Sequence, residues 1–210
     1  DFKKSNLHIL NYSTPINRKV SLKELKKHIF TLPEYPKWIP YRTSYYKEDW
    51  GFCMAYDQFK KLIDEEYHVV ISSTLKEGHL TFGEFFLKGE SEEEILLSCY
   101  VCHPSMCNDN LSGVSLITYL AKYLSNKKLK YSYRFLFIPE TIGAITWLSI
   151  NEKKVNKIRG GLVATCLGDK GSITYKKTRN GNSIMDRVVE MVLKKSTEKF
   201  NIIDFFPAGS

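Results

Sequence analysis

The chain has 210 residues, 43% of them hydrophobic, which suits one domain or one domain carrying a small insertion. Its net charge of +8 comes from interspersed residues, and without a nucleic-acid-binding motif it indicates solvated surface lysines and no nucleic-acid partner. No apolar run reaches the roughly 18 residues that a membrane helix needs, and no signal-like segment follows Asp1, so neither a membrane partner nor secretion is expected. The 5 cysteines, an odd number, fit a reducing environment, which predicts a cytoplasmic location.

The first half of the sequence predicts a small β-rich module over residues 11–88. Residues 67–73 and 80–87 alternate as strands do, and a turn at 76–78 predicts that they pair as a hairpin. Ser21 and Glu24 form a capping box that opens a short helix. The proline- and aromatic-rich segment 35–50 fits either a peptide-binding groove or a loop packed on a core, and the packed loop is the favoured interpretation.

Residues 1–10 and 89–210 are predicted to form an incomplete α/β domain. Three short apolar runs indicate buried strands, and three amphipathic segments indicate helices between and after them. Such alternation requires a mostly parallel sheet with helices on its faces. The charged segment 89–94 is expected to be a surface connection into the first of these strands. The predicted strands are 95–101, 133–138 and 161–167, and the predicted helices are 112–124, 140–151 and one that starts after Asn182–Ser183.

Candidate site residues follow the ends of these three strands. His103 and Asp109 come after the first strand, Glu140 after the second and Asp169 after the third. Because parallel strands end at the same edge of a sheet, we expect these side chains to meet in one crevice. An imidazole and a carboxylate are zinc ligands, and a further carboxylate can serve as the general base of a zinc hydrolase. His103 and Asp109 are therefore candidate metal ligands and Glu140 a candidate base, although Glu140 could also be an ordinary helix-start glutamate.

The segment from Cys99 to His103 also matches the C-x-x-C-H pattern of haem attachment. Haem is not expected, because Cys99 lies inside a predicted buried strand and the side chains of Cys99 and Cys102 should point to opposite faces. A structural zinc site built on the same residues and Cys107 fails for the same reason. The alternative is that cysteines serve as small core residues, and it is strongest for Cys53, Cys99 and Cys166.

Several of these segments resemble a known family, the bacterial aminopeptidase-like proteins often encoded with polysaccharide-biosynthesis genes. That family is similar to the zinc-dependent exopeptidases of the co-catalytic aminopeptidase fold. Its inserted small domain of unknown role is similar to upstream segments of this chain, at residues 11–15, 41–47, 50–53 and 80–84. The segments that carry the catalytic-domain resemblance are Tyr-Val-Cys-His-Pro-Ser-Met-Cys-Asn-Asp-Asn-Leu-Ser-Gly (100–113), Phe-Ile-Pro-Glu-Thr-Ile-Gly (137–143) and Thr-Cys-Leu-Gly-Asp (165–169).

The resemblance implies roles for three residues. His103 matches the first zinc-binding histidine, Asp109 the metal-bridging aspartate and Glu140 the general base. Two-metal members of that fold have further carboxylates where this chain has Thr141 and Ser105, and a metal-binding aspartate where it has Thr165 or Cys166. These departures imply one zinc ion rather than two.

The fold expected on this basis is an α/β zinc-exopeptidase-like mixed sheet flanked by helices, with the β-rich module inserted and both ends truncated. The resemblance also implies a further zinc-binding histidine beyond Ser210, so this fragment is expected to be inactive alone and to lack zinc. The expected activity of the longer protein is hydrolysis of an amide bond next to a free amino group, in a peptide or an amino-sugar conjugate. The alternative is a non-catalytic peptide- or glycan-binding module with a degenerate metal site. An exposed apolar sheet edge would favour a homo-oligomer.

Overall fold

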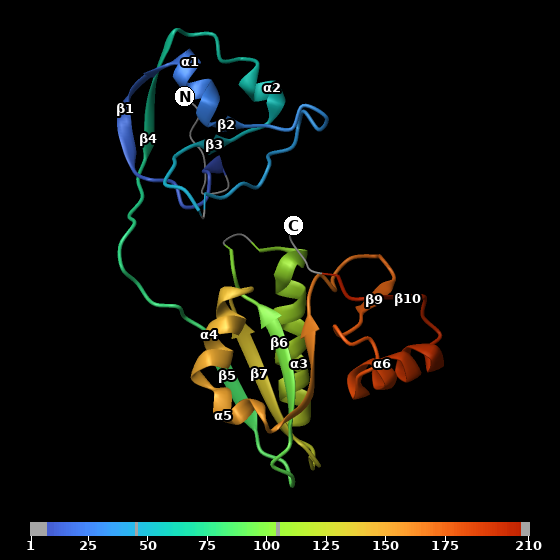
Figure 1. The fold of residues 1–210 in the computed structure, drawn as a ribbon. Coiled ribbons are helices and arrows are strands. Elements are labelled where there is room, and N and C mark those ends of the chain that lie inside the picture. Colours follow the sequence, from blue (N-terminus) through green and yellow to red (C-terminus); the bar gives the residue numbers. More distant parts are fainter. Residues whose placement is uncertain (1–7, 45, 104–105, 207–210) are drawn as a thin grey trace. The chain divides into compact units, whose positions relative to one another are not determined.

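A computed structural model describes residues 8–44, 46–103 and 106–206 of the chain (Figure 1). The chain divides into two compact units, residues 1–78 and 79–210, which are described separately below. The boundary falls ten residues before the end of the predicted β-rich module, at residue 78 rather than 88. Residues 8–10, predicted to belong with the α/β domain, contact the first unit instead, since Ile9 pairs with Phe52 and the Leu10 N–H donates to the Gly51 carbonyl at 3.0 Å.

The first unit contains two small two-stranded sheets. One pairs β1 with β4 in antiparallel fashion, and the other pairs β2 with β3 in parallel. Val20, Leu25 and Val69 form a buried hydrophobic cluster within it. The Ser21 side chain accepts the Glu24 N–H and so starts the first helix where the sequence predicted it. This is one of the two hydrogen bonds of the predicted capping box, and the Glu24 carboxylate pairs with Arg18 at 2.6 Å. The elements are β1 (Ile16–Ser21), α1 (Leu22–Leu25), the 3₁₀ helix η2 (Lys26–His28), β2 (Ile29–Phe30), β3 (Phe52–Cys53), α2 (Tyr56–Phe59) and β4 (Glu66–Ile71).

The predicted hairpin between residues 67–73 and 80–87 is wrong. β4 pairs with β1, with Ile71 opposite Ile16, whereas β5 (Gly83–Leu87) pairs with β7 of the second unit's sheet. Residues 72–82 form no regular structure, so the expected turn at 76–78 does not bring the two strands together. A longer apolar partner strand was available to β5, and tertiary pairing overrode the local turn signal.

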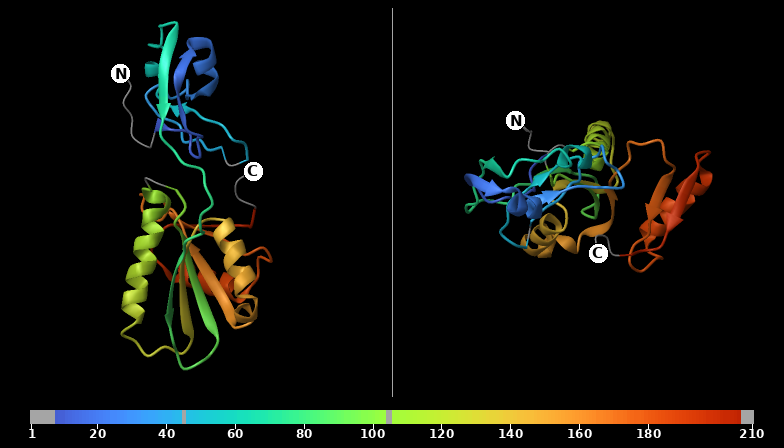
Figure 2. Two further views of the ribbon diagram at one scale, coloured as in Figure 1. Left: turned by 90° about the vertical axis from the view of Figure 1, so that its left-hand side faces the viewer. Right: turned by 90° about the horizontal axis from the view of Figure 1, so that it is seen from above.

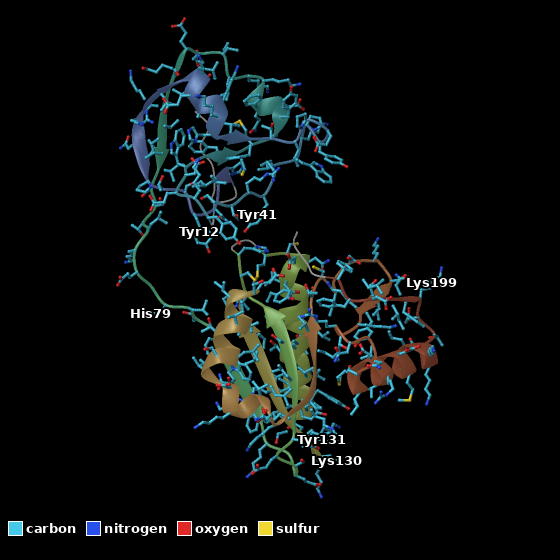
Figure 3. The ribbon with its side chains drawn as sticks, in the orientation of Figure 1. Tyr12, Tyr41, His79, Lys130, Tyr131 and Lys199 are labelled. Atoms are coloured by element: carbon cyan, nitrogen blue, oxygen red, sulfur yellow. The ribbon has the colours of Figure 1, made fainter. Side chains whose placement is uncertain are left out.

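The aromatic segment packs on the core in part, so the favoured interpretation holds for some of its residues. Tyr35, Trp38 and Tyr41 are exposed, whereas Trp50 packs against the buried cluster and stacks on His28 at 3.9 Å between ring centroids. Tyr41 and Tyr12 lie near each other at one end of the unit (Figure 3), where the Asn11 Nδ2 donates to the Tyr41 hydroxyl at 2.9 Å.

The second unit is built on a four-stranded sheet in the order β5-β7-β6-β8. Strands β6, β7 and β8 are parallel and β5 is antiparallel to β7. One long helix, α3, covers one face of the sheet, and α4 and α5 cover the other (Figure 2). This confirms the predicted mixed α/β sheet flanked by helices. The elements are β6 (Glu94–Tyr100), the π helix η3 (Asn108–Ser112), α3 (Gly113–Leu124), β7 (Ser132–Ile138), α4 (Ile142–Ile150), α5 (Glu152–Val155), β8 (Ile158–Ala164), β9 (Ile173–Lys176), α6 (Ile184–Lys195) and β10 (Phe200–Ile203).

Both faces of the central strands are buried, as their continuous apolar runs predicted. Residues Leu97, Cys99 and Phe135 pack with α3 on one face. Leu136 and Ile138 pack against Trp147 of α4 on the other. The sheet core thus fixes where the strand ends emerge.

A buried ion-pair cluster joins the strands below α4. The Arg134 guanidinium donates to both carboxylate oxygens of Glu94, at 2.6 and 2.8 Å, and it also contacts the Glu84 carboxylate. Glu84 in turn accepts the indole N–H of Trp147 at 2.8 Å. The sequence placed Glu94 in a charged surface connection, but only 4% of it is exposed, because the bidentate pairing with Arg134 compensates its burial.

Candidate functional site

The ends of β6 and β7 lie side by side, as predicted. Tyr100, the last residue of β6, is opposite Ile138, the last residue of β7. His103 and Glu140 therefore leave the same edge of the sheet within three residues of this pair. The Glu140 backbone N–H donates to the Cys102 Sγ at 2.9 Å, which ties the two strand ends together.

His103 and Asp109 form the closest pair of the candidate ligands. The His103 Nε2 lies 3.6 Å from the Asp109 Oδ2, and both side chains reach solvent. Asp109 belongs to η3, the irregular turn that precedes α3. The six-residue spacing that suggested this pair in the sequence therefore corresponds to a real juxtaposition.

Asn110 holds this turn in place, and sequence reasoning did not single it out. The side chain is 1% exposed. Its Nδ2 donates to the carbonyl of Ala164 at the end of β8, and its Oδ1 accepts the N–H groups of Gly113 and Cys166. The only available signal was an Asn in a polar loop, which more often indicates an exposed turn. Asn110 thus connects the loop carrying Asp109 to a third strand end.

Charge accumulates at this edge of the sheet. Burial raises the pKa of the Tyr100 hydroxyl, and the negative charges of Glu140, Cys102, Asp109 and Cys166 raise it further. Burial also raises the pKa of the Cys102 thiol, to which the carboxylates of Glu140 and Asp109 add. The two carboxylates therefore act on the same neighbours, although they follow different strands.

The link from Glu140 to α4 is a strained turn. Thr141 has φ +57° and ψ −72°, and the Ile142 N–H donates to the Glu140 carbonyl at 2.6 Å. This is the γ-turn of positive φ, which is rare and costly for a β-branched residue. Strain of this kind concentrates at functional sites, where the surrounding structure holds it.

Asp169 does not join the pair. One of its carboxylate oxygens accepts the Asn108 side-chain N–H at 3.3 Å and the other the Gly171 backbone N–H at 2.6 Å. Cys166, predicted as a core cysteine, is exposed with φ +52°, whereas Cys53 and Cys99 are buried as expected. Ser105 lies outside the described residues.

Within residues 8–44, 46–103 and 106–206, no group of three or more His, Cys, Asp or Glu side chains could hold a metal ion. His103 and Asp109 are thus two donors of the right types, and fewer than the three or four protein ligands of a zinc site. None of the described helices is both long and apolar enough to cross a bilayer.

The fold is similar to about half of the fold of a zinc aminopeptidase. A zinc aminopeptidase from Bacillus subtilis superposes over 84% of this chain and 48% of its own with TM-score 0.61 at 12% identity, and a second structure of that enzyme gives 0.63 at 13%. At this identity the likeness concerns the fold alone. The chain itself belongs to the family described as Domain of unknown function (DUF4910), whose model matches residues 4–210.

Two similar relatives come from Clostridium acetobutylicum. One is provisionally named a polysaccharide biosynthesis protein with an aminopeptidase-like domain and is 56% identical over all 210 residues of this chain. The other is a crystal structure of a provisionally assigned peptidase, with TM-score 0.95 at 56% identity over the whole chain. The chain spans about half the length of each, 48% and 50%. The resemblance seen in the sequence is thereby confirmed.

Proposed function

We propose that the complete protein is a zinc-dependent hydrolase of the aminopeptidase type, which cleaves an amide bond next to a free amino group. His103 and Asp109 would contribute zinc ligands and Glu140 the general base. The observation that carries this proposal is the 3.6 Å separation of the His103 Nε2 and the Asp109 Oδ2 beside the strand end that bears Glu140.

This separation fits a shared zinc ion. Ligands about 2.0–2.1 Å from a tetrahedral zinc lie roughly 3.3 Å from each other, close to the distance found here. An imidazole nitrogen and a carboxylate oxygen are also the donor types that zinc selects. Since two ligands are too few, we propose that the rest of the protein supplies the others, and that this chain alone retains zinc weakly and is inactive.

Zinc and Glu140 would have separate roles in the reaction. Zinc, when bound, supplies polarisation of the scissile carbonyl and activation of a water molecule. Glu140 accepts the proton of the attacking water and returns it to the leaving amine. Its backbone is held by the Cys102 Sγ and by the turn at Thr141, so the carboxylate starts from a fixed position.

The substrate would be a peptide or an amino-sugar conjugate, and the Clostridium relative's name, which joins polysaccharide biosynthesis to an aminopeptidase-like domain, is compatible with both. We place the reaction in the cytoplasm, which is supported by all five cysteines being free thiols.

The substitution Glu140→Gln in the complete protein tests the proposal. It removes a charge with little change in volume, so zinc content and fold should persist while hydrolysis of an aminoacyl amide falls by at least about a hundredfold. Glu90→Gln, at an exposed glutamate of the same unit, is the matched control and should hydrolyse normally. Hydrolysis by Glu140→Gln at close to the wild-type rate would leave Glu140 a helix-start residue.

A further inference from the structure

A stacked pair of aromatic rings is exposed on the connection between β2 and β3. The ring centroids of Tyr35 and Trp38 lie 4.7 Å apart and the ring planes are inclined by 17°. The two residues are 51% and 62% exposed. The same loop also exposes Ile39, and apolar side chains exposed together on one loop form the kind of surface that marks binding sites.

The loop that carries the pair is held in a defined shape. The Tyr35 N–H donates to the Leu32 carbonyl at 3.0 Å and the Trp38 N–H to the Tyr35 carbonyl at 2.9 Å, so two turns follow each other. The Pro36 carbonyl accepts the Asp57 N–H at the start of α2, which anchors the loop to the body of the unit. Three prolines between residues 33 and 40 restrict the backbone further. Binding therefore costs little ordering of the rings.

The stacking restricts what this surface can bind. Proline-rich peptides insert between aromatic rings that stand apart, but Tyr35 and Trp38 cover each other and leave no slot. Single-stranded nucleic acid needs cations along its phosphates. In the described part of this connection the basic side chains are matched in number by acidic ones and form no continuous basic track. The basic residues are Lys37, Arg42 and Lys47, and the acidic ones are Glu34, Glu48 and Asp49.

We propose that the Tyr35–Trp38 pair binds a neutral sugar ring of a glycan. A pyranose in which the axial C–H groups share one face presents a flat apolar surface of about the size of an aromatic ring, with hydroxyls around its edge. The outer face of the stacked pair matches that surface, and Glu34 and Lys37 offer an acceptor and a donor to the hydroxyls. This function lies in a unit that holds none of the candidate hydrolase residues and does not depend on them.

Saturation-transfer NMR with the complete protein tests the proposal. The probes are the neutral sugars cellotriose and N,N′,N″-triacetylchitotriose, and decaproline and the oligonucleotide dT10 represent the competing classes of ligand. We expect saturation of the sugar protons H1, H3 and H5, which share one face, and no saturation of decaproline or dT10. Trp38→Ala should weaken sugar binding by at least about tenfold, the usual scale of one stacking contact.

Two further variants keep the result interpretable. Trp38→Phe preserves a ring and should retain most of the binding, which separates loss of stacking from loss of folding. Tyr119→Ala removes an aromatic side chain that is 72% exposed on α3 in the other unit, and it should bind as the wild type does. Unchanged binding by Trp38→Ala, no saturation of either sugar, or saturation of decaproline or dT10 instead would overturn the proposal.

Discussion

Replacement of Asp186 by asparagine should loosen the layer formed by β9, α6 and β10. The Asp186 side chain is buried, and each carboxylate oxygen accepts one hydroxyl and one backbone N–H. Oδ1 accepts from the Tyr175 hydroxyl at 2.9 Å and the Thr178 N–H at 2.8 Å. Oδ2 accepts from the Thr178 hydroxyl at 2.6 Å and the Ser183 N–H at 2.7 Å.

The arrangement sets the size of the effect. The substitution Asp186→Asn replaces one carboxylate oxygen by an amide nitrogen, which is a donor. Whichever oxygen is replaced, one hydroxyl can rotate to accept, but one backbone N–H is left facing a donor. A lost hydrogen bond to a charged group costs about 1.5–3 kcal/mol. Because the layer has only two strands and one helix and solvent is near, we expect a loss of about 2–3 kcal/mol for Asp186→Asn.

The same residue makes this layer sensitive to acid. Burial alone would raise the pKa of the Asp186 carboxyl, but the hydrogen bonds from Thr178, Ser183 and Tyr175 outweigh it and lower the pKa well below its usual range. A carboxyl with a lowered folded-state pKa stabilises the fold fully above its unfolded pKa of about 3.9, and that stabilisation is lost as the pH falls through the folded pKa. The stability difference between wild type and Asp186→Asn should therefore be largest near pH 7 and shrink below about pH 4.

Amide hydrogen exchange in α6 measures the loosening. Near neutral pH, exchange in Asp186→Asn should be about 30- to 150-fold faster than in the wild type, the equivalent of about 2–3 kcal/mol. Asp204→Asn is the control in the same layer, since its carboxylate is 90% exposed and its pairing with Lys177 should contribute less than about 1 kcal/mol. Equal exchange in Asp186→Asn and wild type would refute the reasoning.

Two further predictions concern the sheet and its edge. Arg134→Met leaves the buried Glu94 carboxylate unpaired and should cost about 3–5 kcal/mol in urea unfolding, whereas Arg159→Met, at an exposed pair, should cost less than about 1 kcal/mol. Similar unfolding midpoints for the two variants would contradict this. Cys102→Ala removes the acceptor of the Glu140 N–H and should speed exchange of that amide about fivefold. Cys102→Ser keeps an acceptor and should leave the exchange rate of that amide close to the wild-type rate. Equal exchange rates in Cys102→Ala and Cys102→Ser would show that the contact with Cys102 does not protect the amide.

The sequence was sufficient for features that depend on periodicity and on strand ends. Apolar runs identified the three parallel strands, although β8 begins and ends three residues earlier than predicted and is partly exposed. The common edge of β6 and β7 brought the Glu140 backbone against Cys102, and the loop after β6 brought His103 beside Asp109. It was also sufficient for the cap at Ser183, which forms the full capping box with Asp186. These are local patterns, or direct consequences of parallel pairing.

What the sequence missed depends on partners far along the chain. The local sequence indicates that Glu94 is a surface charge, because its partner Arg134 lies forty residues later. Asn110 reads as a turn residue until the end of β8 supplies its hydrogen-bond partners. β5 reads as half of a hairpin until β7 offers a better neighbour. Each is a case of tertiary contacts overriding a local signal.

The central claim is that His103 and Asp109 hold a zinc ion in the complete protein. Diffraction from crystals of that protein, measured on both sides of the zinc absorption edge, locates the ion directly. We predict one anomalous peak per chain, about 2.0–2.2 Å from the His103 Nε2 and from an Asp109 carboxylate oxygen. A zinc peak elsewhere in the protein, or no peak beside these two side chains in crystals grown with zinc, would contradict the claim.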